Sequence, residues 1–523
     1  MSKGKSSCAL ALLLAIGSAK SEQGINDFVV GDFDSGFTEG FDSVYLEHCA
    51  VCHGDKMQGS PQGSALVGVA LKAGSSVSEL IASISEGVPT RGMPAWRNVL
   101  SEQHVQNLAI FIAEQRENLV YKDFMELAEL NIPTDIIQSE LHSFEIEVVA
   151  EGIDPVVFSI EPLPDGRILV TERTLGLGIL QPGKEMVRVQ GLPKLYTDVL
   201  VGGLVGAGNG QLLEVKSHPD FENNGRIYLT YGDRCGGCNE RSIESGMDVS
   251  MIRVISGRLD GARWVDEQEI WSTDKEHYTS SPESSAGGRL AFDDQGYLFL
   301  SVGELNSPGL AEDGVQDLDK PYGKIFRVRS NGEIPPDNPF RDNESALPSI
   351  WSLGHRAPQG LAWDDSRKLL WSSEHGPRGG DEINLIKPGA NYGWPLVSNG
   401  SYYDGSKVEF GKVLGIEFDP DDLTYPEVDF TPSPAISSLL VYEGSSFPYW
   451  QGDLIVATLK AEKLIRVRPL ASGKYETETL VDKIARIRDV EQAIDGGILL
   501  LLEHISGAVV VKLSPSLKPL EEG

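Results

Sequence analysis

The sequence has no apolar run long enough to cross a membrane as a helix, which takes about 20 residues. Its most apolar stretch, residues 8–17 (CALALLLAIG), is far shorter. Basic residues are also scarce: 45 Lys and Arg stand against 77 Asp and Glu, a net charge of −32. So much negative charge repels phosphate backbones and anionic lipid, which argues against nucleic-acid and membrane-surface partners. With 40% hydrophobic residues in 523, the chain is typical of a globular protein of about two to four domains.

The N-terminus has the layout of a secretory signal. Lys3 and Lys5 precede the apolar stretch, and the small residues Gly17 and Ala19 follow it. This order of charge, apolar core and small residues predicts a signal peptide over residues 1–19, cut after Ala19. The mature protein is then periplasmic or secreted and has no membrane span, the alternative being an uncleaved N-terminal anchor.

Cysteine is rare, and four of the five cysteines form two C-x-x-C pairs. The first pair is followed by histidine, as Cys49-Ala-Val-Cys52-His53. This pattern indicates covalent haem c, because the two thiols bind the vinyl groups and the imidazole becomes an iron ligand. A zinc half-site and a simple disulfide are the alternatives.

A second iron ligand is available downstream. Met93, in the segment RGMPAW, would complete His/Met ligation, which suits electron transfer. An amphipathic helix is expected from Ser101 to Glu117 and would cover the haem with apolar residues at helical spacing, namely Val105, Leu108, Ala109 and Ile112. With YLEHCAVCHG and GMPAW in place, residues 38–118 resemble an all-α class I cytochrome c domain.

The second pair, Cys235-Gly-Gly-Cys238, lacks a following histidine. In an exported protein this spacing favours a local disulfide. A redox motif or a second haem site is the alternative.

Residues 119–143 are expected to form a linker, and after them glycine becomes frequent and the expected strands are short. Over residues 144–514, β-rich runs recur on either side of turns rich in Asp, Asn and Gly, near positions 166, 225, 296, 366, 452 and 496. Each unit predicts a β-hairpin, and six units that cannot bury their faces alone favour an all-β six-bladed propeller. A pair of sandwiches or a β-helix is the alternative.

Several motifs in this region carry a family resemblance. They are IWSLGHRAPQGLAW (350–363), SSEHGPRGGDEINLIKPGANYGWP (372–395), PYGKIFRV (321–328) and ARIRDV (485–490). Residues 144–514 thereby resemble the pyrroloquinoline quinone (PQQ)-dependent aldose sugar dehydrogenases of the glucose/sorbosone dehydrogenase family. The resemblance implies a quinohaemoprotein that oxidises an aldose or related alcohol, passes electrons to its own haem, and then reduces a downstream acceptor.

Arg486 and Arg488 flank Ile487, so in a strand they project from the same face and can clasp an anion together. The alternative is that the two arginines lie on an exposed strand edge and form salt bridges with some of the many acidic residues. The resemblance assigns quinone binding to these two arginines, to Lys460 and to Arg356, and it also counts Arg356 among the catalytic residues.

The resemblance also suggests that main-chain carbonyls of the loop containing Gly376 and Pro377 hold a calcium ion, a Lewis acid for the quinone. Asp381 falls where the family has an active-site aspartate, although it could simply cap its loop. His355 and His375 are expected to line the pocket.

Three positions depart from the family pattern. Ser285 stands where the family has the histidine base, Ala357 replaces an asparagine, and Asn209 replaces a glutamine. A serine hydroxyl cannot act as a general base near neutral pH. One possibility is that an inserted loop (YTSSPES), between His277 and Ser285, folds His277 back to the site. The other is that the chain is an electron-transfer cytochrome fused to a catalytically degenerate propeller that binds a ligand or partner.

Overall fold

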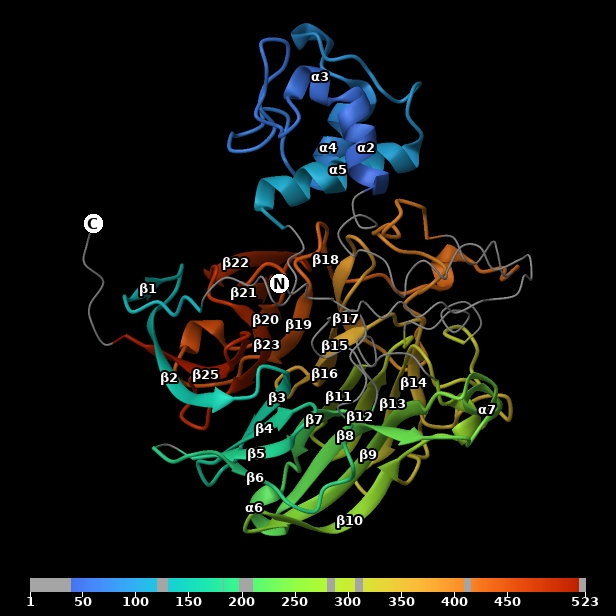
Figure 1. Cartoon of the computed structure of the whole chain (residues 1–523), viewed down its shortest axis with the longest axis vertical. Coiled ribbons are helices and arrows are strands. Elements are labelled where there is room, and N and C mark those ends of the chain that lie inside the picture. Colours follow the sequence, from blue (N-terminus) through green and yellow to red (C-terminus); the bar gives the residue numbers. More distant parts are fainter. Residues whose placement is uncertain are drawn as a thin grey trace, which may run out of the picture.

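The computed structural model describes residues 39–119, 130–181, 183–196, 210–279, 287–305, 314–408 and 415–516. A small helical domain sits at one end of a larger β-domain (Figure 1). The predicted signal peptide and the positions Asn209 and Ser285 lie outside the described residues.

Within the described residues, the helical domain contains α2 (Glu39–His48), α3 (Ala50–His53), α4 (Val77–Glu86), the 3₁₀ turn η2 (Pro89–Arg91) and α5 (Glu102–Glu117). Ser76 and Glu79 form a reciprocal capping box at α4, and Ser101 caps α5 through the amide of His104. The predicted helix at residues 101–117 is therefore confirmed. Val105, Leu108, Ala109 and Ile112 are all buried.

The β-domain is a six-bladed propeller, as predicted. Its first three sheets are β3 (Val157–Pro162), β4 (Ile168–Glu172), β5 (Gly176–Leu180), β6 (Val187–Arg188); β7 (Leu212–Ser217), β8 (Arg226–Cys235), β9 (Val249–Asp260), β10 (Arg263–Trp271); and β11 (Gly287–Phe292), β12 (Tyr297–Val302), β13 (Lys324–Arg329), β14 (Ile350–Leu353). The next two are β15 (Pro358–Asp364), β16 (Leu369–Glu374), β17 (Asp381–Ile386), β18 (Val428–Phe430); and β19 (Ile436–Val441), β20 (Leu454–Thr458), β21 (Leu464–Pro469), β22 (Tyr475–Val481).

The sixth sheet joins both ends of the domain, in the order β1-β2-β25-β24-β23. Its strands are β1 (Ile137–Gln138), β2 (Ser143–Ile153), β23 (Arg486–Gln492), β24 (Ile498–Glu503) and β25 (Ala508–Pro515). Antiparallel pairing of β2 with β25 closes the ring, and β1, in the second half of the expected linker, adds the outermost strand.

Each of the six expected turns joins the innermost strand of a blade to the strand beside it, as β3 to β4 in the first blade and β23 to β24 in the sixth. Five of them contain a glycine with positive φ, for example Gly166 at 84° and Gly496 at 84°, a conformation that other residues rarely adopt. Short helices interrupt the loops: α6 (Phe221–Asn224), α7 (Glu240–Ser245), η4 (Lys275–His277), η6 (Pro420–Asp422) and η7 (Pro448–Trp450). Cys235 and Cys238, at the end of β8, form the predicted local disulfide.

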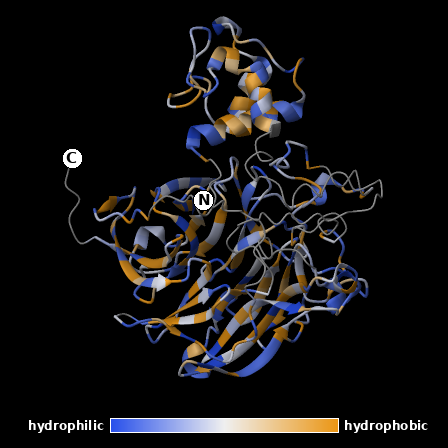
Figure 2. Cartoon of the chain, viewed as in Figure 1, coloured by the Kyte–Doolittle hydropathy of each residue, from blue (hydrophilic) through white to orange (hydrophobic). Residues whose placement is uncertain are grey.

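Hydrophobic residues concentrate in the strands and helices, while the connecting loops are largely hydrophilic (Figure 2). The first strands of successive blades contact one another around the ring. Across the ring, Arg289 pairs with Glu214 at 2.7 Å and with Asp489 at 2.9 Å, joining β11 to β7 and β23. No helix among the described residues is long and apolar enough to span a membrane.

Candidate functional site

The haem-attachment residues lie together at the start of α3. Cys49 precedes the helix as its N-cap, and Cys52 and His53 lie within it. Both cysteines are free thiols, and burial, followed by the neighbouring Cys52, raises the pKa of Cys49 to about 11. Nδ1 of His53 is 2.7 Å from the carbonyl oxygen of Ser64, which fixes the ring and leaves Nε2 for an iron ion.

Met93 belongs to the same apolar cluster as Cys49, together with Leu66, Ile81 and Trp96. Its backbone is held by a bridge to Val88. Two thiols, an oriented imidazole and a thioether around one apolar cluster fit a c-type haem.

The arginines of β23 project together, as strand alternation predicts. Both pair with Glu503 of the neighbouring strand β24: Arg486 Nε lies 3.2 Å from Oε2, and Arg488 Nε lies 2.7 Å from Oε1. The side chain of Glu503 is only 4% exposed. The pair therefore does not lie on an exposed edge, and it already holds one internal carboxylate.

Arg356 lies against the loop that contains Gly376 and Pro377. Its Nη1 donates to the carbonyl oxygens of Gly376 at 2.8 Å and His375 at 3.2 Å, and its Nε lies 3.5 Å from Glu304. Successive carbonyls thus converge on a positive charge, which here is the guanidinium.

Asp381, at the start of β17, organises this loop. Its Oδ1 accepts hydrogen bonds from the Gly376 amide at 3.1 Å and the Ser433 hydroxyl at 2.8 Å, and its Oδ2 accepts one from the Ile436 amide at 3.0 Å. Burial raises its pKa to about 6. A Cβ atom at position 376 would lie 2.2 Å from the carbonyl oxygen of Gly380, so this tight loop requires glycine.

The charges of the predicted cations act on two neighbouring residues of this loop region, His375 and Asp381. Burial, followed by the charges of Arg356, Arg488 and Arg486, lowers the pKa of His375 to about 3. The charge of Lys460 favours a lower pKa for Asp381, against the larger effect of burial. Nζ of Lys460 also lies 3.4 Å from Oε1 of Glu114 in α5. The buried Nε2 of His375 has no hydrogen-bond partner among the described residues. Four cations and one unpaired ring nitrogen fit a ligand that carries several carboxylates and carbonyls.

Three carboxyl groups that no sequence motif predicted lie beside this cluster: Glu304 and Glu374 are buried, and Glu382 is half-buried. Glu374 accepts hydrogen bonds from the Arg356 amide at 2.8 Å and from Asn384 at 2.7 Å. Burial raises the pKa of Glu304, and burial together with Glu374 raises that of Glu382 well above its usual value. Glu374, Glu382, Gly376 and Pro377 line one cavity of about 60 Å³. Among the described residues, no group of three or more Asp, Glu, His or Cys side chains is placed to hold a metal ion, so the calcium site stays a prediction.

Among the described residues, no hydrogen bond or ion pair joins His277 to this cluster. Its carbonyl oxygen accepts a hydrogen bond from Tyr322 at 2.6 Å, its Nε2 lies 3.5 Å from Glu276, and burial lowers its pKa. Ala357 is buried beneath the site, where its carbonyl accepts from the His375 amide at 3.0 Å.

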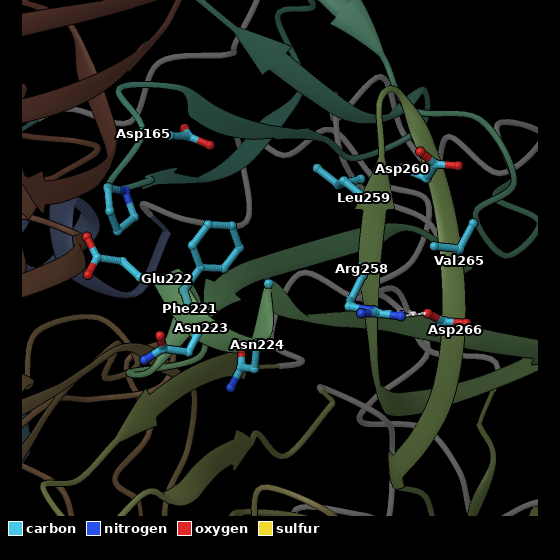
Figure 3. A pocket seen from close by; sticks show the side chains of 12 residues that line it. Asp165, Phe221, Glu222, Asn223, Asn224, Arg258, Leu259, Asp260, Val265 and Asp266 are labelled. Atoms are coloured by element: carbon cyan, nitrogen blue, oxygen red, sulfur yellow. Dashed lines mark hydrogen bonds and ion pairs between the residues drawn. The ribbon is translucent and has the colours of Figure 1, made fainter.

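A larger hollow of about 830 Å³ opens elsewhere, between the first two blades. Its lining includes Asp165, Phe221 and Asp260, and Arg258 there already pairs with Asp266 (Figure 3). The strand β10 and helix α6 that form it lie at the end of the propeller opposite the helical domain (Figure 1). It contains none of the predicted site residues.

Comparison with known protein families divides the chain in the same way. Residues 155–511 match the model for "Glucose / Sorbosone dehydrogenase", and residues 38–112 match that for "Cytochrome C oxidase, cbb3-type, subunit III".

Two curated proteins and one solved structure are similar to the propeller region. The chain is 36% identical to aldose sugar dehydrogenase YliI of Escherichia coli (strain K12), over 71% of this chain and 92% of that protein. It is 30% identical to quinoprotein glucose dehydrogenase B of Acinetobacter calcoaceticus, over 72% and 89%. The crystal structure of the soluble aldose sugar dehydrogenase from Escherichia coli, in the apo form, superposes with a TM-score of 0.61 at 32% identity, covering 71% of this chain and all of that one.

Proposed function

The chain belongs to the glucose/sorbosone dehydrogenase family and carries a cytochrome c domain, and from this premise we propose that it is an exported quinohaemoprotein. It oxidises an aldose or a related alcohol at the propeller, reduces its own haem c, and delivers electrons to a downstream acceptor.

The observation that carries this proposal is the convergence of Arg356, Lys460, Arg486 and Arg488 on the loop around Gly376. In a chain with a net charge of −32, four cations gathered around one loop indicate a site for a polycarboxylate. One relative is named a quinoprotein, which agrees with that ligand.

Each group of site residues has its own role in this proposal. Arg486, Arg488 and Lys460 bind the carboxylates of PQQ, which supplies an acceptor for two electrons and two protons. Arg356 and Asp381 fix the loop, and Asp381 would face the substrate. The carbonyls of Gly376 and Pro377, next to Glu374 and Glu382, would hold calcium, which would supply a Lewis acid for the quinone. Tethering the cytochrome domain raises its effective concentration at the propeller.

The substrate's hydroxyl proton needs an acceptor. With Ser285 in place of the family histidine, the chain lacks that imidazole, so we expect slow turnover. This departure favours the second candidate function, a cytochrome fused to a catalytically degenerate propeller that binds a ligand or partner.

One experiment separates the two functions. PQQ and calcium are added to the purified haem protein, a panel of aldoses and alcohols is supplied, and the haem absorbance is followed. Reduction that requires both quinone and substrate supports the dehydrogenase. Tight quinone binding without haem reduction by any substrate favours the second function. A protein that binds no quinone contradicts the proposed quinone site.

Matched variants test the site itself. Arg486→Ala removes a proposed quinone cation, whereas Arg468→Ala removes an arginine of blade five that pairs with the exposed Glu476. We expect quinone binding to weaken at least about tenfold in the first and to stay unchanged in the second.

A further inference from the structure

Helix α5 of the cytochrome domain rests on two loops of the propeller, residues 376–380 and 398–405. Carboxamide side chains make most of the contacts: Gln103 donates to Ser401 at 2.8 Å, Gln106 to the Asn399 carbonyl at 3.1 Å, and Asn107 to the Gly405 carbonyl at 2.8 Å. Gly380, Ser398 and Asn399 also line the small cavity beside Gly376. The cytochrome therefore docks on the wall of the candidate site.

One carboxylate anchors this contact. Glu114 of α5 is 3% exposed and lies between two propeller cations. Arg378 binds it through Nη2 at 2.6 Å and Nε at 3.1 Å, whereas Lys460 reaches it at 3.4 Å. Arg378 also stacks over the ring of Phe41, 3.7 Å from its centroid. Arg378 is thus the firm partner, and Lys460 is the second, looser cation.

The docked domain turns its haem-attachment residues away from the propeller. In Figure 1, α3 lies at the far end of the cytochrome domain, and α5 lies between it and the propeller. A helix with its side chains is about 10 Å thick. The docked arrangement therefore keeps the residues that attach haem at least one helix away from the candidate site.

We propose that Glu114 is a positioning residue that latches the cytochrome domain over the site by competing with a quinone carboxylate for Lys460. The inference rests on the proposed function, which assigns Lys460 to the quinone. It adds that cofactor binding and cytochrome docking oppose each other. Quinone binding draws Lys460 from Glu114, loosens α5, and frees the domain to turn its haem toward the propeller.

The sign of the coupling follows from charge. The Glu114 carboxylate, next to Lys460, repels an incoming anion and occupies part of the cation's hydrogen-bonding capacity. Coupling of this kind is reciprocal. Docking of the cytochrome domain therefore weakens quinone binding by the same factor by which quinone binding weakens docking.

The first test is equilibrium binding of PQQ to the full-length haem protein in the presence of calcium. Glu114→Gln removes the charge and keeps the shape, whereas Glu117→Gln makes the same change at an exposed position of α5. We expect quinone affinity to rise about fivefold or more in E114Q and to remain at the wild-type value in E117Q and in the charge-retaining Glu114→Asp. Equal binding by all four proteins overturns the latch and leaves the proposed function intact. Absence of binding in all four overturns both.

The second test measures the docking contact itself. Amide hydrogen exchange of residues 376–380 and 398–405 is measured in the wild-type haem protein with and without PQQ. We expect quinone to speed exchange at 398–405, where α5 rests, and E114Q alone to do the same. Exchange at 398–405 that stays constant or slows when quinone binds contradicts the opposition between cofactor and docking.

Discussion

Arg488 and Glu503 form a two-point ion pair, Nε to Oε1 at 2.7 Å and Nη2 to Oε2 at 3.1 Å. Glu503 also binds Arg486, so one buried carboxylate sets the spacing of the two cations proposed to hold the quinone.

Glu503→Gln should destabilise the protein by about 3 kcal/mol, because it leaves two guanidinium groups facing each other in a buried setting. Burial alone would raise the pKa of Glu503, but Arg488 and Arg486 outweigh it and hold the pKa below its usual value. The stability from this pair is therefore present above the ordinary glutamate pKa of about 4.3 and is lost as the pH falls through the lower folded value. Denaturant unfolding from pH 3 to 7 measures both effects.

The matched control is Glu476→Gln, which breaks the exposed pair with Arg468. We expect it to change stability by less than about 1 kcal/mol. Equal losses in the two variants would contradict a special role for Glu503.

Asp381→Asn should lower stability by about 1–3 kcal/mol, because an amide cannot accept from all three of the donors that meet the carboxylate. Burial raises the pKa of Asp381 to about 6. The folded protein therefore retains this proton between about pH 4 and 6, and stability from this group falls as the pH rises across that window. The difference in unfolding free energy between wild type and variant, measured from pH 4 to 8, should shrink over the same window. A difference that does not vary with pH would show that Asp381 titrates normally.

Met93→Leu should leave haem covalently attached, because Cys49 and Cys52 remain, but remove the thioether ligand. Loss of His/Met ligation lowers the reduction potential and changes the absorption spectrum of the haem. Met57→Leu, at a buried position in the same domain, is the control and should preserve both properties. A spectrum unchanged in the Met93 variant would mean that another residue binds the iron.

Ser285→His tests whether the departure from the family pattern limits the rate. Restoring an imidazole base should speed quinone-dependent haem reduction by about 10²-fold or more. Ser284→His places the same ring one residue away and should have little effect. If neither variant reacts faster, the missing base is not what limits turnover.

The fold was largely predictable because its signals are local. Each hairpin turn is recognisable from the Asp, Asn and Gly within a few residues, and five of the six turns contain a glycine with positive φ. The outermost strand β1 was not predicted, because two residues carry no period and their pairing with β2 depends on the finished sheet. Pairing of β2 with β25 joins residues at opposite ends of the domain, a relationship that no local pattern records.

The site was predictable only as far as motifs and strand alternation reach. They brought out Arg486, Arg488 and the Gly376 loop. They could not identify Glu503 or Glu114, because nothing local distinguishes these among 77 acidic residues. The hydrogen bonds of Asp381 similarly reach Ser433 and Ile436, more than 50 residues away in sequence.

The closure of the sixth blade has a consequence for biogenesis. Because β2 must pair with the last strand, the ring stays open until the C-terminal residues have been synthesised. The helices that surround Cys49 and Cys52 are complete by Glu117 and contact one another locally. Contacts close in sequence form fastest, so the cytochrome domain can fold and receive its haem while the propeller is still unfinished.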